Sequence, residues 1–361
     1  VEALRKDWST DPFTFLEKDG YFYGRGTTDM KSDDACLVAN LIRLKQEGFI
    51  PNRDIIVALT DHEENGEYNG VQWLLANRRE LIDAEYCVNP DAGGGESKNG
   101  KEIVMMIQTS EKVYYDFKFE VKNKGGHSSL PVKDNAIYHL SEALTKVANY
   151  QFPIRLNETT RKFFERSALQ ETGQKKADML AMAKLPLDTA AANRLAALLP
   201  GYNSRMRTTC VATMLSGGHA ENALPQHAEA NVNCRMLPDD SPENVLATLN
   251  AIVADTQVVI TRKNNSVIGP LSPLRKDVMD PLEKLTAKMW PGVTVTPTMS
   301  TGASDGKMIR AAGIPVYGIS GMFTDMDDVR AHGRDERIGV KEYYKGVEFM
   351  YSFIKALTAG S

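Results

Sequence analysis

Residues Asp54-Ile-Ile-Val-Ala-Leu-Thr60 form a nearly continuous apolar run, and Asp61-His62-Glu63-Glu64 follows it directly. Such a run is typical of a strand that is covered on both faces, as the strands of a parallel sheet are. Apolar residues recur at helical spacing over 33–47 and 71–81, and a second short strand is indicated over 85–89. This alternation of strands and helices predicts a sheet flanked by helices.

A different pattern begins near residue 110. Residues 113–122 alternate between the two faces of a strand, and four large apolar side chains share one face (Tyr115, Phe117, Phe119 and Val121). Strands then follow in runs with helices between them, which indicates an α+β unit covered on one face. The helices are predicted over 134–148, 158–200 and 242–254, and the strands over 207–216, 226–237 and 256–262.

After Pro273 the first pattern returns. Helices are predicted over 278–289 and after the turn Gly302–Asp305, and an apolar strand over 315–319. A final helix carries an apolar stripe from Tyr344 onward. The end of the sequence thus shows the same alternation of strands and helices as its beginning.

Two domains fit a chain of 361 residues. We predict an α/β domain with a central, mostly parallel sheet and helices on both faces, made of residues 1–109 and 271–361. An α+β domain over 110–270 is inserted into it.

The formal net charge is −4, and residues of both signs are spread along the sequence. Phosphate binding needs a concentrated basic face, so the composition argues against nucleic acid as a partner. No apolar run reaches the roughly 18 residues that span a bilayer, so we expect a soluble protein. The cysteines lack the CxxC spacing of a zinc site, and we expect buried free thiols at all four positions (Cys36, Cys87, Cys210 and Cys234).

Acidic residues and one histidine follow predicted strands or turns of the α/β part: Asp29, Glu64, Asp91 and His332. Ligands of open α/β sheets bind outside the carboxyl ends of the strands, so these side chains could converge there. Carboxylates and imidazole are ligands for zinc, cobalt or manganese. Glu63 points differently from its neighbour Glu64, which leaves it free to transfer a proton. Taken singly, each acid is equally well explained as a solvated loop residue.

Several motifs, in this order, resemble a family of zinc metallopeptidases. The family includes aminoacylase, carnosinase, succinyl-diaminopimelate desuccinylase and carboxypeptidases G and S. The glycine–histidine motif and the long helical insert before residue 205 are most similar to the carboxypeptidase S-like branch. The matching residues are Asp11-Pro12-Phe13, Tyr23-Gly24-Arg25-Gly26, Asp29-Met30-Lys31, Glu63-Glu64, Asp91, Gly125 to Pro131, Thr301 to Asp305 and Ala331-His332.

The resemblance implies a catalytic domain that holds two zinc ions, for which cobalt or manganese can substitute. Asp29 would bridge the two ions, Glu64 and His332 would complete one site, and Asp91 would bind the other ion. Glu63 would act as the general base and then as the general acid.

The inserted domain would be a lid and dimerisation domain. The resemblance implies that His127 reaches the active site of the partner in a homodimer and stabilises the oxyanion. Asn222 and Arg235 would hold the substrate carboxylate, a task that suits the fork of a guanidinium group. Gly302 would contact the substrate.

Two departures from the family pattern stand out. His62 occupies the place where the family has an aspartate before the glutamate pair, and the His-x-Asp motif expected ahead of Val1 is absent. We expect the sequence to be a fragment of a longer protein, with an incomplete second metal site as the alternative. A cytoplasmic and a periplasmic or secreted location both stay open.

The leading hypothesis is a two-zinc carboxypeptidase or N-acyl-amino-acid hydrolase that acts on small peptides or acylated amino acids with a free carboxylate. One alternative is a dipeptidase of the carnosinase kind. Another is a catalytically impaired relative that binds ligands, because the first histidine ligand is absent.

Overall fold

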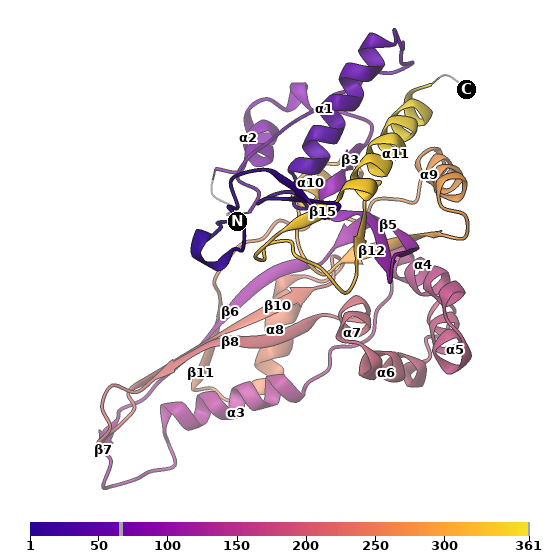
Figure 1. Ribbon diagram of the computed structural model, residues 1–361. Coiled ribbons are helices and arrows are strands. Elements are labelled where there is room, and N and C mark those ends of the chain that lie inside the picture. Colours follow the sequence, from indigo (N-terminus) through magenta and orange to yellow (C-terminus); the bar gives the residue numbers. More distant parts are fainter. Residues whose placement is uncertain (65–67, 360–361) are drawn as a thin grey trace.

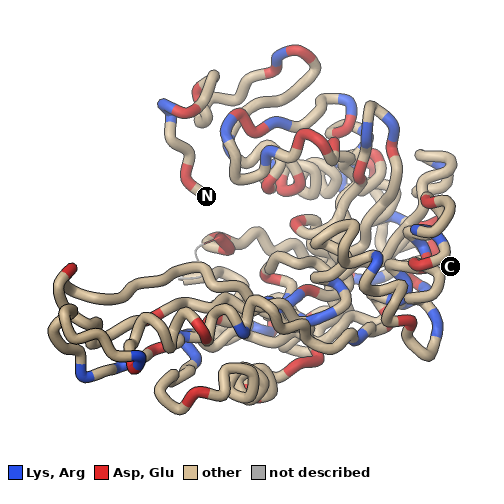
Figure 2. The backbone as a smooth tube through the Cα atoms, turned by 90° about the horizontal axis from the view of Figure 1, so that it is seen from below, with Lys and Arg blue, Asp and Glu red and all other residues tan. Residues whose placement is uncertain are grey.

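A computed structural model describes residues 1–64 and 68–359. The chain forms a mixed sheet with its helices, a long antiparallel sheet that extends away from it, and a group of short helices beside both (Figure 1). Acidic and basic residues are interspersed along most of the backbone (Figure 2). Within the described residues, no helix combines the length and the apolar character needed to cross a membrane.

The mixed sheet has six strands in the order β14-β4-β5-β13-β3, with β12 also paired to β5. The pairs β12/β5, β13/β3 and β14/β4 are parallel, whereas β4/β5 and β13/β5 are antiparallel. The sheet is therefore mixed rather than mostly parallel. Its strands are β3 (Cys87–Asn89), β4 (Gly94–Lys98), β5 (Lys101–Glu111), β12 (Thr294–Ser300), β13 (Val316–Gly318) and β14 (Phe323–Asp325).

Helices pack around the mixed sheet much as the periodicity predicted. The helix α11 (Val340–Thr358) packs against α1 (Lys31–Gln46) and α9 (Lys276–Met289), and α9 contacts β12. On β13 lies α10 (Gly306–Ala311), which also contacts α2 (Gly70–Asn77). The core between them is aromatic and aliphatic, and it includes Ile107, Leu282, Tyr317, Phe349 and Phe353.

The strand predicted over 54–60 is wrong. These residues belong to no strand of the structure, and Ile56, Val57 and Leu59 are 48%, 37% and 56% exposed. A strand is stabilised by hydrogen bonds to a neighbouring strand, and no described strand pairs with this segment. Apolar composition alone therefore misled the prediction.

The long antiparallel sheet has the order β11-β6-β10-β8. The alternation predicted for residues 113–122 is confirmed by β6, whose apolar face packs with α3 and α8 in one core. At the far end of the sheet two short strands pair (Figure 1). The elements are β6 (Val113–Lys122), β7 (Gly126–His127), α3 (Ala136–Asn149), β8 (Thr209–Gly217), β9 (Ala223–Leu224), β10 (His227–Met236), α8 (Pro242–Val253) and β11 (Val258–Arg262).

The helical stretch predicted over 158–200 is broken into short helices, which we call the helical group: α4 (Glu158–Ser167), α5 (Gly173–Met182), α6 (Thr189–Leu198) and α7 (Pro200–Met206). Pro186 lies between α5 and α6, and Pro200 is the first residue of α7, where a helix tolerates proline; neither could lie inside one long helix without breaking it. The group has its own core around Phe164 and Met179, and α4 contacts β12 of the mixed sheet. Residues 110–270 thus form two separately packed parts, namely the long sheet with its helices and the helical group. The predicted domain boundaries stay predictions.

The expectation of four free thiols is wrong for two of them. Cys210 on β8 and Cys234 on β10 are directly opposite in the antiparallel register and form a disulfide. Cys36 is a buried free thiol and Cys87 is a partly buried one. The pair escaped prediction because only the strand register brings residues 24 apart into contact.

Candidate metal centre

A small three-stranded sheet brings the two ends of the sequence together. Its strands are β1 (Leu16–Lys18), β2 (Tyr21–Tyr23) and β15 (Arg337–Gly339), in the order β1-β2-β15. Tyr23 lies opposite Arg337, and the Gly24 amide donates to the Glu336 carbonyl at 3.1 Å. The glycine-rich turn after β2 therefore lies beside the loop that carries His332.

Glu336 organises this turn, although no sequence pattern distinguishes it from its neighbours. Its carboxylate is fully buried and accepts from the backbone amides of Gly26, Thr28 and Asp29 at 3.1, 2.8 and 3.0 Å. It also pairs with Arg25 at 2.6 Å. Charge-assisted bonds of this kind hold a loop firmly, so Glu336 fixes the backbone at Asp29.

Three of the predicted metal ligands converge. The His332 Nε2 atom lies 2.7 Å from Asp29 Oδ2 and 2.7 Å from Glu64 Oε1. One potential ligand atom from each residue lies within 4.8 Å of the others. Two carboxylates and an imidazole are a donor set that zinc accepts, and the cluster is open enough for an ion to enter because His332 is half exposed.

The surrounding carboxyl groups repel one another. Burial, followed by the nearby charge of Glu64, raises the pKa of Asp29. Burial and the charges of Asp91, Asp305 and Glu64 raise the pKa of Glu63 to about 8. A divalent cation would relieve this repulsion, so the electrostatics also fit a metal.

Asp91 lies near the three candidate ligands rather than among them. It follows β3 in a short 3-10 helix (Pro90–Ala92), and it is not part of the three-residue cluster. Burial, then the charges of Asp29, Asp305 and Glu64, raises its pKa to about 7. Asp91 is therefore close enough to interact electrostatically with Asp29 and Glu64. Its role as a ligand of a second ion stays a prediction.

Hydrogen bonds of Asn69 connect the segment that carries Glu63 to the turn Thr301–Asp305. The Asn69 amide donates to Asp305 Oδ1 at 2.6 Å and to the His62 carbonyl at 3.5 Å. Ser304 in turn donates to the buried Glu111 at 2.9 Å. Through Asn69, this turn positions the segment that carries Glu63. Gly302 lies in the exposed part of the same turn.

The residues predicted to contact substrate from the inserted domain lie at two opposite ends of the long sheet. His127 is exposed on β7 with its Nδ1 atom 2.7 Å from the Ser129 hydroxyl, and the Asn222 carbonyl accepts from the Ser128 amide at 3.1 Å. Arg235 lies near the other end of β10, with its guanidinium over the ring of Tyr114. His127 and Asn222 thus share the far end of the long sheet (Figure 1).

This separation bears on the predicted roles of Asn222 and Arg235, which stay predictions. His227 and Arg235 are at opposite ends of β10, which places them about 26 Å apart at the usual rise of a strand. Asn222 lies beyond His227, so it cannot bind the same carboxylate as Arg235 within one chain. The two can act together only across two subunits.

The family model for Peptidase family M20/M25/M40 matches residues 1–356. The chain belongs to this family. It is a hydrolase of the metallopeptidase type, as the motifs around Asp29 and Glu63 predicted.

Named relatives of this M20/M25/M40 family member are similar over almost its whole length. The probable carboxypeptidase S-like 2 of Dictyostelium discoideum is 27% identical over 96% of the chain and 68% of that protein. The human N-fatty-acyl-amino acid synthase/hydrolase PM20D1 is 28% identical, over 98% of the chain and 72% of that protein.

Solved structures share the fold. An M20 family metallo-carboxypeptidase from Sulfolobus solfataricus is 16% identical, with a TM-score of 0.63 over 98% of this chain and 81% of that one. Human carnosine dipeptidase 1 is 16% identical, with a TM-score of 0.58 over 99% of this chain and 78% of that one.

A second cluster in this family member is a weaker metal candidate. Glu120, His227 and Glu229 also offer ligand atoms within 4.8 Å of one another. The Lys118 ammonium lies 3.0 Å from both Glu120 and Glu229. A positive charge therefore already neutralises part of the charge of these acids.

Proposed function

We propose that this M20/M25/M40 peptidase is a two-zinc amide hydrolase, acting as a carboxypeptidase or N-acyl-amino-acid hydrolase. The convergence of Asp29 and Glu64 on His332, with Glu63 beside them, carries this proposal. The names of relatives support it, since they include a carboxypeptidase S-like protein and an N-fatty-acyl-amino acid synthase/hydrolase. The substrates would be small peptides or acylated amino acids with a free carboxylate.

Asp29, Glu64 and His332 would hold one ion, and Asp91 with Asp29 would hold the other; cobalt or manganese could replace zinc. When bound, zinc polarises the amide carbonyl and lowers the pKa of water. Glu63 accepts a proton from the attacking water and returns it to the leaving amine. Its partial burial beside Asp91 and Asp305 favours the protonated form that the second transfer needs.

Arg235 would hold the free carboxylate of the substrate. Arg235 is partly buried and its guanidinium lies over the ring of Tyr114, with 4.7 Å between guanidinium carbon and ring centre, and no acid of the described residues lies within 4.0 Å of it. A guanidinium without a protein acid can form two parallel hydrogen bonds to a substrate carboxylate. This arrangement favours substrates with a carboxylate next to the scissile bond.

Substrate panels test this proposal. We expect hydrolysis of N-acyl amino acids and blocked dipeptides, and none of the same compounds with an amidated carboxyl end. Arg235→Met should raise KM about ten-fold or more, because a charge-assisted bond is lost. The control is Arg262→Met. Arg262 lies on β11 of the same sheet as Arg235 but pairs with Glu243 of α8, so its replacement should leave KM unchanged. Equal cleavage of amidated substrates contradicts the proposal, and faster cleavage of free dipeptides favours a dipeptidase.

An exposed sheet edge supports a homodimer through the lid domain. The strand β8 is at the edge of the long sheet, and Val211, Met214 and Leu215 on it are 60%, 69% and 67% exposed. Exposed apolar edge strands tend to pair with another chain. A second lid seated there could bring His127 and Asn222 of one subunit to the metal centre of its partner.

Mixing of two inactive variants tests the shared site. We expect His127→Ala and Glu63→Gln each to be nearly inactive. After random reassociation of an equal mixture about half of the dimers are mixed, and each mixed dimer has one intact site of two. The mixture should therefore recover about a quarter of wild-type activity. Subunit exchange is followed with a tag on one variant. Mixed dimers that form without any recovery of activity would show that His127 does not serve the partner.

A further inference from the structure

Lys112 is a buried lysine that no carboxylate neutralises. It lies between β5 and β6, where the chain passes from the mixed sheet to the long sheet, and it is 1% exposed. Its ammonium group donates to the Arg207 carbonyl at 2.8 Å and to the hydroxyls of Thr209 and Ser204 at 3.2 and 3.4 Å. Among the described residues, no acid lies within 4.0 Å of it. These oxygens can satisfy its donors, but none carries a charge that offsets its burial.

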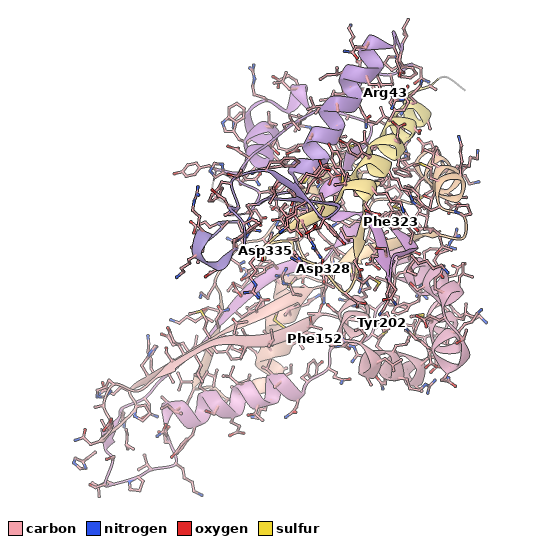
Figure 3. The ribbon with its side chains drawn as sticks, in the orientation of Figure 1. Arg43, Phe152, Tyr202, Phe323, Asp328 and Asp335 are labelled. Carbon is pink, nitrogen blue, oxygen red and sulfur yellow. A yellow bond between two sulfur atoms is a disulfide. The ribbon has the colours of Figure 1, made fainter. Side chains whose placement is uncertain are left out.

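The partners of Lys112 belong to two different parts of the molecule. Ser204 lies on α7 of the helical group, and Thr209 is the first residue of β8. Figure 1 shows α7 at the end of β8 that adjoins the mixed sheet, and Tyr202 of α7 is labelled there in Figure 3. The Lys112 side chain therefore joins the β5–β6 crossing to the helical group and to the edge strand of the long sheet.

The residue before Lys112 holds the other side of this crossing. The buried Glu111 carboxylate accepts from Ser304, in the turn Thr301–Asp305 beside the metal centre, at 2.9 Å. The Lys112 amide donates to the carbonyl of Ser300, directly before that turn, at 2.9 Å. Two consecutive residues thus attach the surroundings of the metal centre and the start of β8 to one point of the backbone.

Arg235, to which we assign the substrate carboxylate, lies in the row of the sheet beside this junction. On β10 it is directly opposite Thr209 of β8 and Tyr114 of β6. Burial, and then the charge of Arg235, lowers the pKa of Lys112 to about 7, while Asp240 acts in the opposite direction. The two cations are therefore close enough to repel each other, and a carboxylate bound to Arg235 would reduce this repulsion.

We propose that Lys112 is a positioning residue, which sets the place of Arg235 relative to the metal centre and so selects substrates by the position of their carboxylate. The inference rests on the proposed function, because that function assigns the carboxylate to Arg235. A guanidinium held in one place favours a carboxylate one carbon from the amide nitrogen over one that is a carbon farther away. Without the hydrogen bonds of Lys112, the start of β8 loosens and Arg235 accepts either position.

Two isomeric substrates test this selection in the zinc-loaded full chain. N-acetylalanine and N-acetyl-β-alanine have the same atoms, but the carboxylate of the second is one carbon farther from the amide. We expect the wild type to favour the first in kcat/KM by about ten-fold or more, because only that isomer makes the charge-assisted bond well. Lys112→Met should lower this preference about five-fold, and Thr209→Val, which removes one acceptor, about two-fold. A loss of stability alone would lower both rates and leave their ratio unchanged.

Hydrogen exchange provides a second readout, which needs neither metal nor turnover. The protected amides at the start of β8 should exchange about ten-fold faster in Lys112→Met, whereas those of β11 should be unchanged. The matched control is Thr248→Val on α8, where the lost hydroxyl donates to the Asn244 carbonyl at 2.8 Å. It should alter neither the substrate ratio nor the exchange of β8.

The double variant Lys112→Met/Arg235→Met should show the same ratio as Arg235→Met alone, because both changes act through one anchor. Valine suits a strand as well as threonine does, so Thr209→Val is informative even if Lys112→Met does not fold. An active wild type whose ratio is unchanged in Thr209→Val, or unchanged exchange of β8, overturns the role of Lys112 alone. A wild type that hydrolyses neither isomer overturns the proposed function, and the selection with it.

Discussion

Glu63→Gln is expected to lower turnover of an N-acyl amino acid by about 10²–10⁴-fold or more, which is the usual contribution of general acid–base catalysis. Glutamine keeps the size of the side chain but cannot exchange a proton with water or with the leaving amine. Because Glu63 is not among the three converging ligands, the metal content of the variant should equal that of the wild type. Turnover and metal content are measured on the same preparation.

The control for this variant is Asp61→Asn in the same loop. Asp61 is exposed and contacts only the His62 ring, at 2.9 Å, among the described ion pairs. Its replacement should leave turnover within a factor of about two, as expected of surface changes away from a site. Substantial turnover in Glu63→Gln with metal still bound would remove Glu63 from the mechanism.

Removal of metal with a chelator is expected to abolish turnover, and added zinc to restore it. His332→Ala should not recover on addition of zinc at the same concentration, because its Nε2 atom is the point on which Asp29 and Glu64 converge. His227→Ala, in the cluster that Lys118 already neutralises, should recover like the wild type. Full activity in the chelator, or equal loss in His227→Ala, would contradict the assignment of the centre.

Local periodicity predicted much of this fold. The alternation of residues 113–122 fixed which face of β6 is buried, and helical spacing located α1, α3 and α9 within a few residues. Such patterns succeed because one buried face repeats every two or about 3.6 residues. The same reasoning failed at 54–60, because a strand also needs a partner, and composition does not reveal one.

Long-range contacts account for the features that the sequence left out. Glu336 binds three amides about 310 residues away from it in sequence, and the Cys210–Cys234 disulfide depends on the register of β8 and β10. Asn222 and Arg235 were paired from the family resemblance, yet the length of β10 separates their regions. Motifs identified the candidate ligands Asp29, Glu64 and His332, whereas only the fold shows what positions them.

The most direct test of the central claim is anomalous diffraction at the zinc edge from crystals of the zinc-loaded protein. The account predicts a strong peak about 2.0–2.2 Å from Asp29 and Glu64 oxygens and from the His332 imidazole. A peak found instead at Glu120, His227 and Glu229, or no peak near His332 in crystals that contain zinc, would contradict it.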